Sequence, residues 1–253
     1  HNVPSFNSLK SGNWYKIAIP QTSIYKIDFD FMTKNLKVPA NELRFSTFGI
    51  FGYGGGALEE DNAAPYFEDL PENSIQIQDN NNNDIWDADD FILFFGKGPY
   101  GWKPENQQMK HTSAYYSDLQ HFFITTSNGS KKSVLNQPIT GSPQRILSNF
   151  NDFGVFEKDS VNPNKTGRTW FCPPMTNIRN EYQFTIPMQG LSAGSNCIGR
   201  FSYYTKITSG QLSVFINDVF VYSKSITNSP NLQTDTFTFS ASDKSINVKF
   251  RLN

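Results

Sequence analysis

Short apolar runs with a period of two residues dominate the second half of the sequence. Such alternation places one face of a strand against a core and the other in solvent. Asn217-Asp218 separates two of the runs and predicts a tight hairpin turn. The pattern predicts an antiparallel β-sandwich, jelly-roll-like, over residues 151–253. The alternating runs lie at 182–186, 201–203, 212–216, 220–222, 237–239 and 246–252.

The first half of the sequence also favours strands, with less regular spacing. One short helix is expected near residues 30–38, with Asp30 as its N-cap. Residues 131–150 lose apolar side chains and gain Ser, Asn and Pro, which is typical of a linker. We therefore predict an all-β chain of two β-rich units, 1–130 and 151–253. The strands expected in the first unit lie within 14–20, 24–29, 43–48, 74–78, 91–95 and 121–125.

Composition restricts the partners of the chain. The 253 residues carry a formal net charge of −1 with a sequence pI near 6.3, which argues against nucleic acid or an anionic membrane as a partner. No apolar run approaches the twenty or so residues of a transmembrane helix, so none is expected. The final strand runs directly into Asn253, and we expect the chain to be a fragment of a longer protein.

The segment Asp79–Asp90 is rich in short oxygen-bearing side chains and has the spacing of a twelve-residue calcium loop. Two departures are Asp84 at position 6, where Gly is usual, and an Asp where position 12 prefers Glu. An Asn-rich turn without metal is the alternative, because Asn and Asp bond readily to their own backbone. The predicted Ca²⁺ ligands, at positions 1, 3, 5, 7, 9 and 12, are Asp79, Asn81, Asn83, the Ile85 carbonyl, Asp87 and Asp90.

Other chemistry-bearing residues favour structural roles. Cys172 and Cys197 form one bridge if the protein is exported, or remain two buried thiols. His111, Asp118 and His121 lack a recognised zinc spacing and are interpreted as structural. The acidic residues within 59–61 and 68–69 are interpreted as solvated loop groups rather than glycosidase acids.

Several motifs, taken in order, resemble the amino-terminal region of the PorU-like family of type IX secretion sortases. The order extends over about 160 residues and is more specific than any one motif. Two departures are Ser23, where the family often has Gly, and Cys172, where Gly commonly follows the aromatic pair. The motifs are Gly12–Ile17, Ile24–Ile27, the glycine segment after Phe45, Asp84–Pro99, His111 with Tyr115–Asp118, Phe156–Asp159 and Gly167–Phe171.

This resemblance implies an exported protein at the surface of a Gram-negative bacterium, associated with the outer membrane. In the family, a gingipain-like cysteine peptidase domain follows this region, removes the carboxy-terminal sorting domains of cargo and joins the cargo to a lipopolysaccharide anchor. No residue here matches the catalytic Cys or His of that domain. The implied role is a non-catalytic module whose partners are the downstream peptidase domain, outer-membrane secretion components and cargo sorting domains.

Two other function classes remain open from the sequence. A carbohydrate-binding or adhesion module would use exposed aromatic rings, and Trp102 is expected to be the most exposed tryptophan. A prodomain-like inhibitor of a neighbouring peptidase is the third class.

Overall fold

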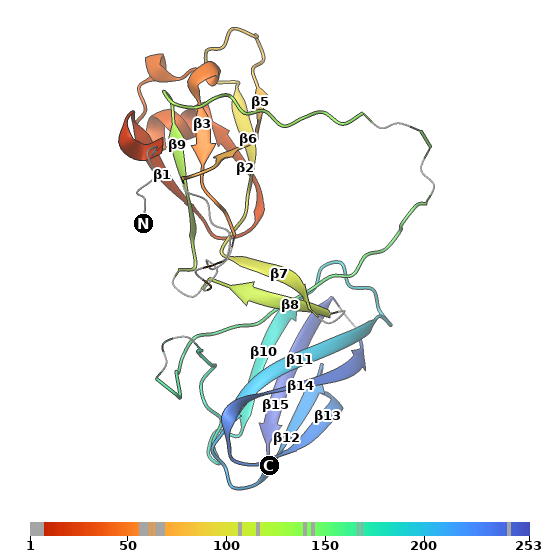
Figure 1. Ribbon diagram of the computed structural model, residues 1–253. Helices are drawn as coiled ribbons and strands as arrows, with labels where there is room; N and C mark the ends of the chain where they lie inside the picture. The colour runs from red at the N-terminus through yellow and green to blue at the C-terminus, as the bar shows by residue number, and fades with distance from the viewer. Residues whose placement is uncertain are drawn as a thin grey trace. The chain divides into compact units, whose positions relative to one another are not determined.

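The computed structural model describes residues 8–55, 61, 63, 69–105, 108–114, 117–138, 141–142, 145–165, 167, 169–241 and 244–253. The chain divides into two compact units, His1–Ser142 and Pro143–Asn253, here called the N-unit and the C-unit. Strands make up both units, and short helical turns are added in the N-unit (Figure 1), so the all-β prediction is confirmed. No helical turn in the described residues has the length and apolar character needed to cross a membrane.

Two antiparallel sheets and one hairpin form the N-unit. The first sheet has the order β1-β9-β3-β4 and the second the order β2-β6-β5, while β7 and β8 pair only with each other among the described strands. Their bounds are β1 Trp14–Ile19, β2 Ser23–Asp28, β3 Gly49–Phe51, β4 Glu72–Asn73, β5 Ile75–Gln78, β6 Phe91–Gly96, β7 Tyr100–Glu105, β8 Gln108–Ser113 and β9 Gln120–Thr125.

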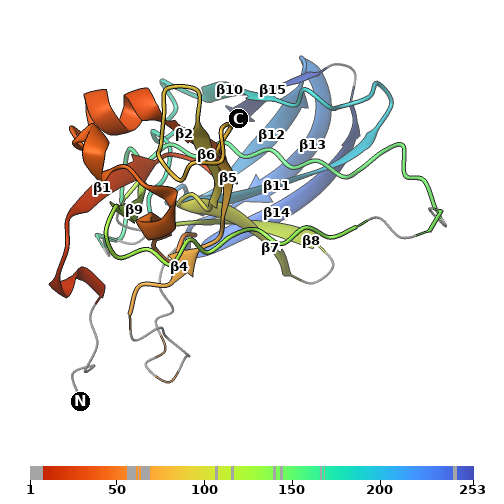
Figure 2. The same ribbon diagram turned by 90° about the horizontal axis from the view of Figure 1, so that it is seen from above.

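Short helical turns fill the segments between β2 and β3 (Figure 2). The predicted helix is present, but it is shorter and Phe31–Asn35 is wound as a π-helix. Asp30 makes no side-chain cap. Asp28 supplies the cap instead, because its Oδ1 accepts the N–H of Phe31 at 2.9 Å. The other turns are η1 Ser8–Lys10, η3 Ala40–Glu42 and η4 Phe45–Thr47, and the π-helix is η2.

One apolar core lies between the two sheets and these turns. Ile92 and Phe94 reach it from β6 and Phe122 and Ile124 from β9. The largest fully buried side chain, Trp86, comes from the Asp79–Asp90 loop rather than from a strand. It packs against two rings of the η4 region, Phe45 at 5.2 Å and Phe48 at 5.1 Å between ring centroids. The loop is thereby attached to the core.

The C-unit is an antiparallel sandwich with sheets β10-β15-β12-β13 and β11-β14. Strands pair first with last, second with fifth and third with fourth, which is the nested pairing of a jelly roll. Asn217 and Asp218 both have positive φ, 49° and 64°, as the predicted hairpin turn requires. The bounds are β10 Glu181–Pro187, β11 Asn196–Thr205, β12 Gly210–Ile216, β13 Val219–Ile226, β14 Ser229–Ser240 and β15 Ser245–Leu252.

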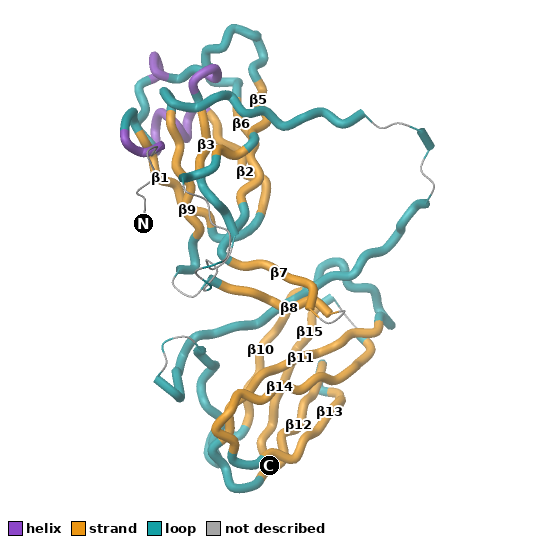
Figure 3. The backbone as a smooth tube through the Cα atoms, viewed as in Figure 1, coloured by secondary structure: helices purple, strands orange, loops and turns teal. Residues whose placement is uncertain are grey.

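Rings from the two sheets meet in the C-unit core. Phe201 of β11 lies 5.1 Å from Phe250 of β15, and Tyr222 of β13 stacks on Phe237 of β14 at 5.8 Å. Between β9 and β10 the described residues form loops and isolated bridges but no strand (Figure 3).

Candidate functional site in the Asp79–Asp90 loop

The loop joins two neighbouring antiparallel strands, β5 and β6, and its base is fixed by backbone hydrogen bonds. The N–H of Trp86 donates to the carbonyl of Leu43 at 3.2 Å, and the N–H of Phe45 donates to the carbonyl of Asp84 at 3.1 Å. These bonds flank a bridge between Arg44 and Ile85. In such a bridge the N–H and C=O of Ile85 point away from Arg44. The Ile85 carbonyl therefore points toward the loop, as position 7 of a calcium loop requires.

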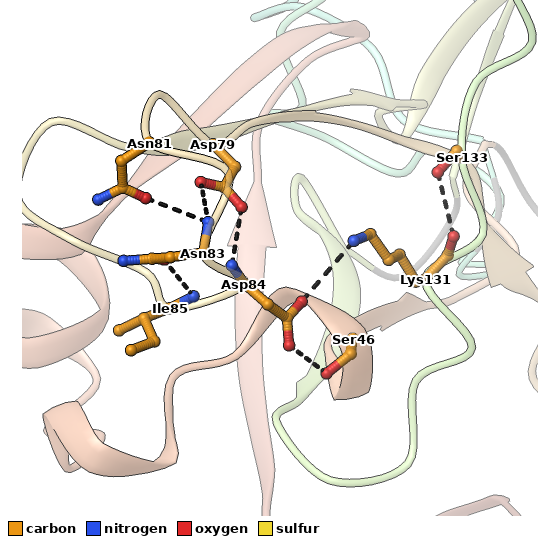
Figure 4. A network of polar contacts seen from close by, with 8 residues as sticks. All are labelled: Ser46, Asp79, Asn81, Asn83, Asp84, Ile85, Lys131 and Ser133. Carbon is orange, nitrogen blue, oxygen red and sulfur yellow. Dashed lines mark hydrogen bonds and ion pairs between the residues drawn. The ribbon is translucent and has the colours of Figure 1, made fainter.

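Three predicted ligands organise the first half of the loop by bonding its backbone (Figure 4). The carboxylate of Asp79 accepts the N–H groups of Asn83 at 3.3 Å and Asp84 at 3.0 Å. Oδ1 of Asn81 accepts the same Asn83 N–H at 3.3 Å, and Oδ1 of Asn83 accepts the N–H of Ile85 at 2.7 Å. These are the local side-chain-to-backbone bonds that Asn and Asp form in turns.

Asp87 joins this group from the second half of the loop. Its Oδ2 accepts the Nδ2 amide groups of Asn81 at 2.8 Å and Asn83 at 3.3 Å. The structure therefore brings Asp79, Asn81, Asn83 and Asp87 into one hydrogen-bonded cluster.

Asp90 has a different environment and is 2% exposed. Its Oδ1 accepts the N–H of Asn80 and its Oδ2 the N–H of Asp87, both at 2.9 Å. The indole N–H of Trp86 donates to the Asp90 carbonyl at 3.2 Å. Asp90 therefore closes the loop by binding backbone at both of its ends. As a position-12 ligand it would use the second lone pair of an oxygen that already accepts an N–H.

Asp84 takes the left-handed conformation that the sixth loop position needs, with φ of 65°. Its side chain points away from the cluster, where Oδ2 accepts the hydroxyl of Ser46 at 2.6 Å and Oδ1 lies 3.7 Å from Nζ of Lys131 (Figure 4). The hydrogen bond from Ser46 is the main cause that lowers the pKa of Asp84. Sequence reasoning missed Ser46 and Lys131, since both are distant in sequence and neither carries a local signal.

The donor set fits a calcium ion in part. The cluster supplies carboxylate and amide oxygens and one carbonyl, which are the ligands that Ca²⁺ prefers. Across the described residues, no group of three or more His, Cys, Asp or Glu side chains is placed as a metal cluster. Binding would therefore depend on the amide and carbonyl oxygens, and the calcium site stays a prediction.

His111 lies on β8 of the β7–β8 hairpin, and Asp118 contacts that hairpin through Tyr100. His111 stacks on Tyr100 at 5.8 Å and meets the edge of Trp102 at 5.2 Å. Asp118 accepts the hydroxyl of Tyr100 at 2.5 Å. His121 is on β9, opposite Ala18 of β1.

The cysteines are free thiols, each half-buried, and burial raises the pKa of Cys197. The expectation for Trp102 was wrong, because Trp102 is half-buried whereas Trp170 is 45% exposed.

Tyr115–Tyr116 and the acids at 59, 60 and 68 lie outside the described residues. Asp69, the remaining acid of the second group, accepts both the N–H and the hydroxyl of Ser8 and is therefore not simply solvated.

Fold and site together define a two-unit, all-β module with a jelly-roll sandwich and an Asx-rich loop set between strands. No protein-family model matches the sequence, and no curated protein matches it. Among solved structures, the fold is similar to that of dimeric latent PorU from Porphyromonas gingivalis, with a TM-score of 0.77 and 18% sequence identity. The match covers 98% of this chain and 23% of that chain. The chain therefore has a PorU-like fold, as its motifs predict, and spans less than a quarter of the protein it matches.

Proposed function

We propose that this chain is a non-catalytic module of a PorU-like sortase at the cell surface. It supports or positions a downstream cysteine peptidase domain that processes the carboxy-terminal sorting domains of exported cargo. The observation that carries the proposal is the fold likeness over 98% of this chain to only 23% of PorU, which leaves most of that protein for other domains. The ordered motifs from Gly12 to Phe171 agree with it.

The placement of the thiols supports a non-catalytic role. A cysteine nucleophile needs a thiolate and a nearby base, usually His. Both cysteines belong to the C-unit, whose sequence contains no histidine, so neither thiol has a histidine base within its own unit. Burial keeps Cys197 in its thiol form by raising its pKa.

A peptidase assay tests the absence of catalysis directly. The purified chain is incubated with labelled casein and with a cargo protein that carries its sorting domain. We expect no cleavage, and the same result for Cys172→Ala. Cleavage by the wild type that disappears in Cys172→Ala would overturn the proposal.

A second experiment tests the supporting role. The chain is mixed with the separately expressed peptidase domain of its parent protein, and association is measured by sedimentation velocity. We expect a complex and unchanged or increased peptidase activity. Absence of a complex contradicts the supporting role, and a complex with reduced activity favours the inhibitor class instead.

One observation favours a carbohydrate-binding module as the second candidate. The C-unit has a cavity of about 180 Å³ lined in part by Asn164, Phe171 and Tyr204, and the exposed Trp170 adjoins it in sequence. Aromatic rings beside amide groups are suited to sugar rings. Glycan-array binding that Trp170→Ala abolishes and Trp102→Ala retains would establish this alternative.

We also propose that the loop cluster binds Ca²⁺ through Asp79, Asn81, Asn83, the Ile85 carbonyl, Asp87 and Asp90. The left-handed Asp84 and the inward Ile85 carbonyl support this proposal. A ligand that binds only the folded state raises its stability by mass action. Calcium should therefore raise the Tm of the chain, and Asp79→Ala should lose that increase.

Asp84→Asn is the matched control for the calcium experiment, because the Asp84 side chain points away from the cluster toward Ser46. It should keep the calcium-dependent increase in Tm. A wild-type Tm that is the same in millimolar calcium and in EDTA would rule out the site.

A further inference from the structure

The outer edge of β5 is paired along only part of its length. Residues 131–136, here called the edge strap, run parallel to β5 and bridge Ile75 through Ser133. The N–H of Ile75 donates to the carbonyl of Lys132, and the N–H of Val134 donates to the carbonyl of Ile75, both at 2.9 Å. Among the described residues, these two bonds are the whole ladder between the strap and β5.

The strap is fixed up to Val134 and then leaves the sheet. The carboxylate of Glu72 accepts the N–H and the hydroxyl of Ser130, and the Glu72 carbonyl accepts Nζ of Lys132 at 2.8 Å. On the other side Lys131 lies against Asp84 (Figure 4). Leu135, directly after Val134, is 91% exposed. The strap therefore stops pairing with β5 after Val134. Its residues, all of them described, make no backbone hydrogen bond to the next residue of β5 that faces this edge.

That next position is Ile77. Backbone N–H and C=O groups of a strand point to alternate sides, so residues two apart present theirs to the same edge. Because Ile75 bonds outward to the strap, the N–H and C=O of Ile77 also point outward. No backbone group of the described residues bonds to Ile77 at this edge. The Ile77 side chain meanwhile packs against the core.

A groove of about 430 Å³ lies beside this open edge, within the N-unit. The strap forms one wall, with Val134 55% exposed, and β5 forms the other, with Ile77 half-buried. Asp79 is at the loop end of the groove. Lys131 also lines it, but its charge is compensated by Asp84 at 3.7 Å. The groove therefore combines a mostly polar lining, apolar contacts at Ile77 and Val134, an unpaired strand edge and one net negative charge.

We propose that this groove binds an extended peptide segment of a partner protein, which adds to the sheet at Ile77. The segment supplies a carbonyl to the Ile77 N–H and an N–H to the Ile77 carbonyl, as Lys132 and Val134 do for Ile75. Its alternate side chains are apolar, to face Val134, and a basic residue faces Asp79. An extended backbone supplies this donor and acceptor at the spacing of a strand. The inference goes beyond the proposed function and does not depend on the parent being a sortase.

Selection from a displayed library of random peptides tests the proposal, with the whole chain as target and EDTA present to remove calcium. We expect selected peptides to show alternating apolar residues and one basic residue. In ¹⁵N-labelled protein, the Ile77 amide should shift on peptide addition and exchange more slowly with solvent. Val134→Glu should weaken binding by about tenfold or more.

Ile24→Glu is the matched control. Ile24 is an exposed apolar residue on β2 of the same sheet, 67% exposed, and it does not line the groove. This variant should bind as the wild type does. Failure to select any peptide, equal binding by Val134→Glu, or an Ile77 amide that neither shifts nor gains protection would each overturn the proposal. The amide measurement needs no substitution and stays decisive if Val134→Glu does not fold.

Discussion

The core side chains of the two units are buried to different extents. In the N-unit, Phe45, Phe48 and Trp86 are each 1% exposed or less. In the C-unit, Val214 is the single described core side chain at 0%, and the other buried apolar residues are 4–8% exposed. Rings such as Phe201 pack against that core while remaining half-buried.

Sheet size explains the difference. The N-unit places four strands and three strands around its core and covers the remainder with helical turns and the Trp86 loop. The C-unit places four strands against two, so the rings of the smaller sheet remain partly exposed at their sides. Irregular segments therefore carry much of the packing in the N-unit, whereas regular strands carry it in the C-unit. The candidate calcium loop is consequently also a structural element.

Trp86→Ala should give the largest effect. Removing a fully buried indole leaves a cavity among Phe45, Phe48 and their neighbours, and we expect a loss of about 3–5 kcal/mol in the free energy of unfolding of the N-unit. Urea unfolding followed by amide hydrogen exchange separates the two units. Hydrogen exchange in β12 of the C-unit should be unaffected by Trp86→Ala. Trp170→Ala, at an exposed ring, is the control and should change the free energy of unfolding by no more than about 0.5 kcal/mol.

Phe201→Ala should give a smaller effect in the C-unit. Its ring contacts Phe250, Tyr222 and Phe237, but it is only half-buried, so less apolar area is lost. We expect a loss of about 2 kcal/mol, measured by the same exchange experiment on β12. Phe220→Ala, at a ring that is 56% exposed, is the control and should be near neutral. If Phe201→Ala lowered the free energy of unfolding as much as Trp86→Ala does, the proposed difference in core burial between the two units would be wrong.

Local patterns predicted most of the strands and the Asn217-Asp218 turn, because alternation and turn chemistry are properties of neighbouring residues. The cap of the short helix was wrong, since Asp28 and Asp30 are both capable N-caps and sequence alone does not choose between them. The pairing of β11 with β14 joins residues that are 24 to 44 positions apart, from Thr205↔Ser229 to Asn196↔Ser240, and its register depends on packing across the sandwich.

The Asp79–Asp90 loop shows the same difference between local contacts, which follow from the sequence, and tertiary contacts, which do not. Asp79, Asn81 and Asn83 were grouped by their calcium-loop spacing, and their bonds to the loop backbone are local; their calcium ligation stays a prediction. The burial of Trp86 and the contact of Asp84 with Ser46 are tertiary and left no signature in the spacing. The PorU-like fold was recognised from the order of motifs, a signal distributed over the chain, and the structural comparison confirmed it.

The C-unit should lose stability in alkali through Tyr203. Burial, and then the hydrogen bond to Asp235 at 3.0 Å, raise the pKa of Tyr203 from 10.0 to about 12. Folding therefore favours the neutral phenol, so this contribution is complete below pH 10 and is lost as the pH rises toward 12. Absorbance of the phenolate in the ultraviolet measures the titration, and β12 exchange reports the stability. Tyr203→Phe should lessen the alkaline loss, and an equal loss in that variant would contradict the assignment.

The N-unit should instead lose stability in acid through Asp84, with the smallest effect of the series because the Asp84 side chain is 36% exposed and solvent screens its interaction with Lys131. The Ser46 hydroxyl, with a smaller contribution from Lys131, holds the pKa of Asp84 below 3.8. A carboxyl with a depressed folded pKa stabilises the fold above its unfolded pKa, and that stability is lost as the pH falls through the folded value. Asp84→Asn should therefore show a weaker acid dependence of the urea midpoint below pH 3.8. Ser46→Ala should weaken the dependence in the same direction, because it removes the main cause of the shift. An acid dependence unchanged in both variants would show that Asp84 contributes nothing to it, and would leave Asp69, whose pKa Ser8 lowers in the same way, as the next carboxyl to replace.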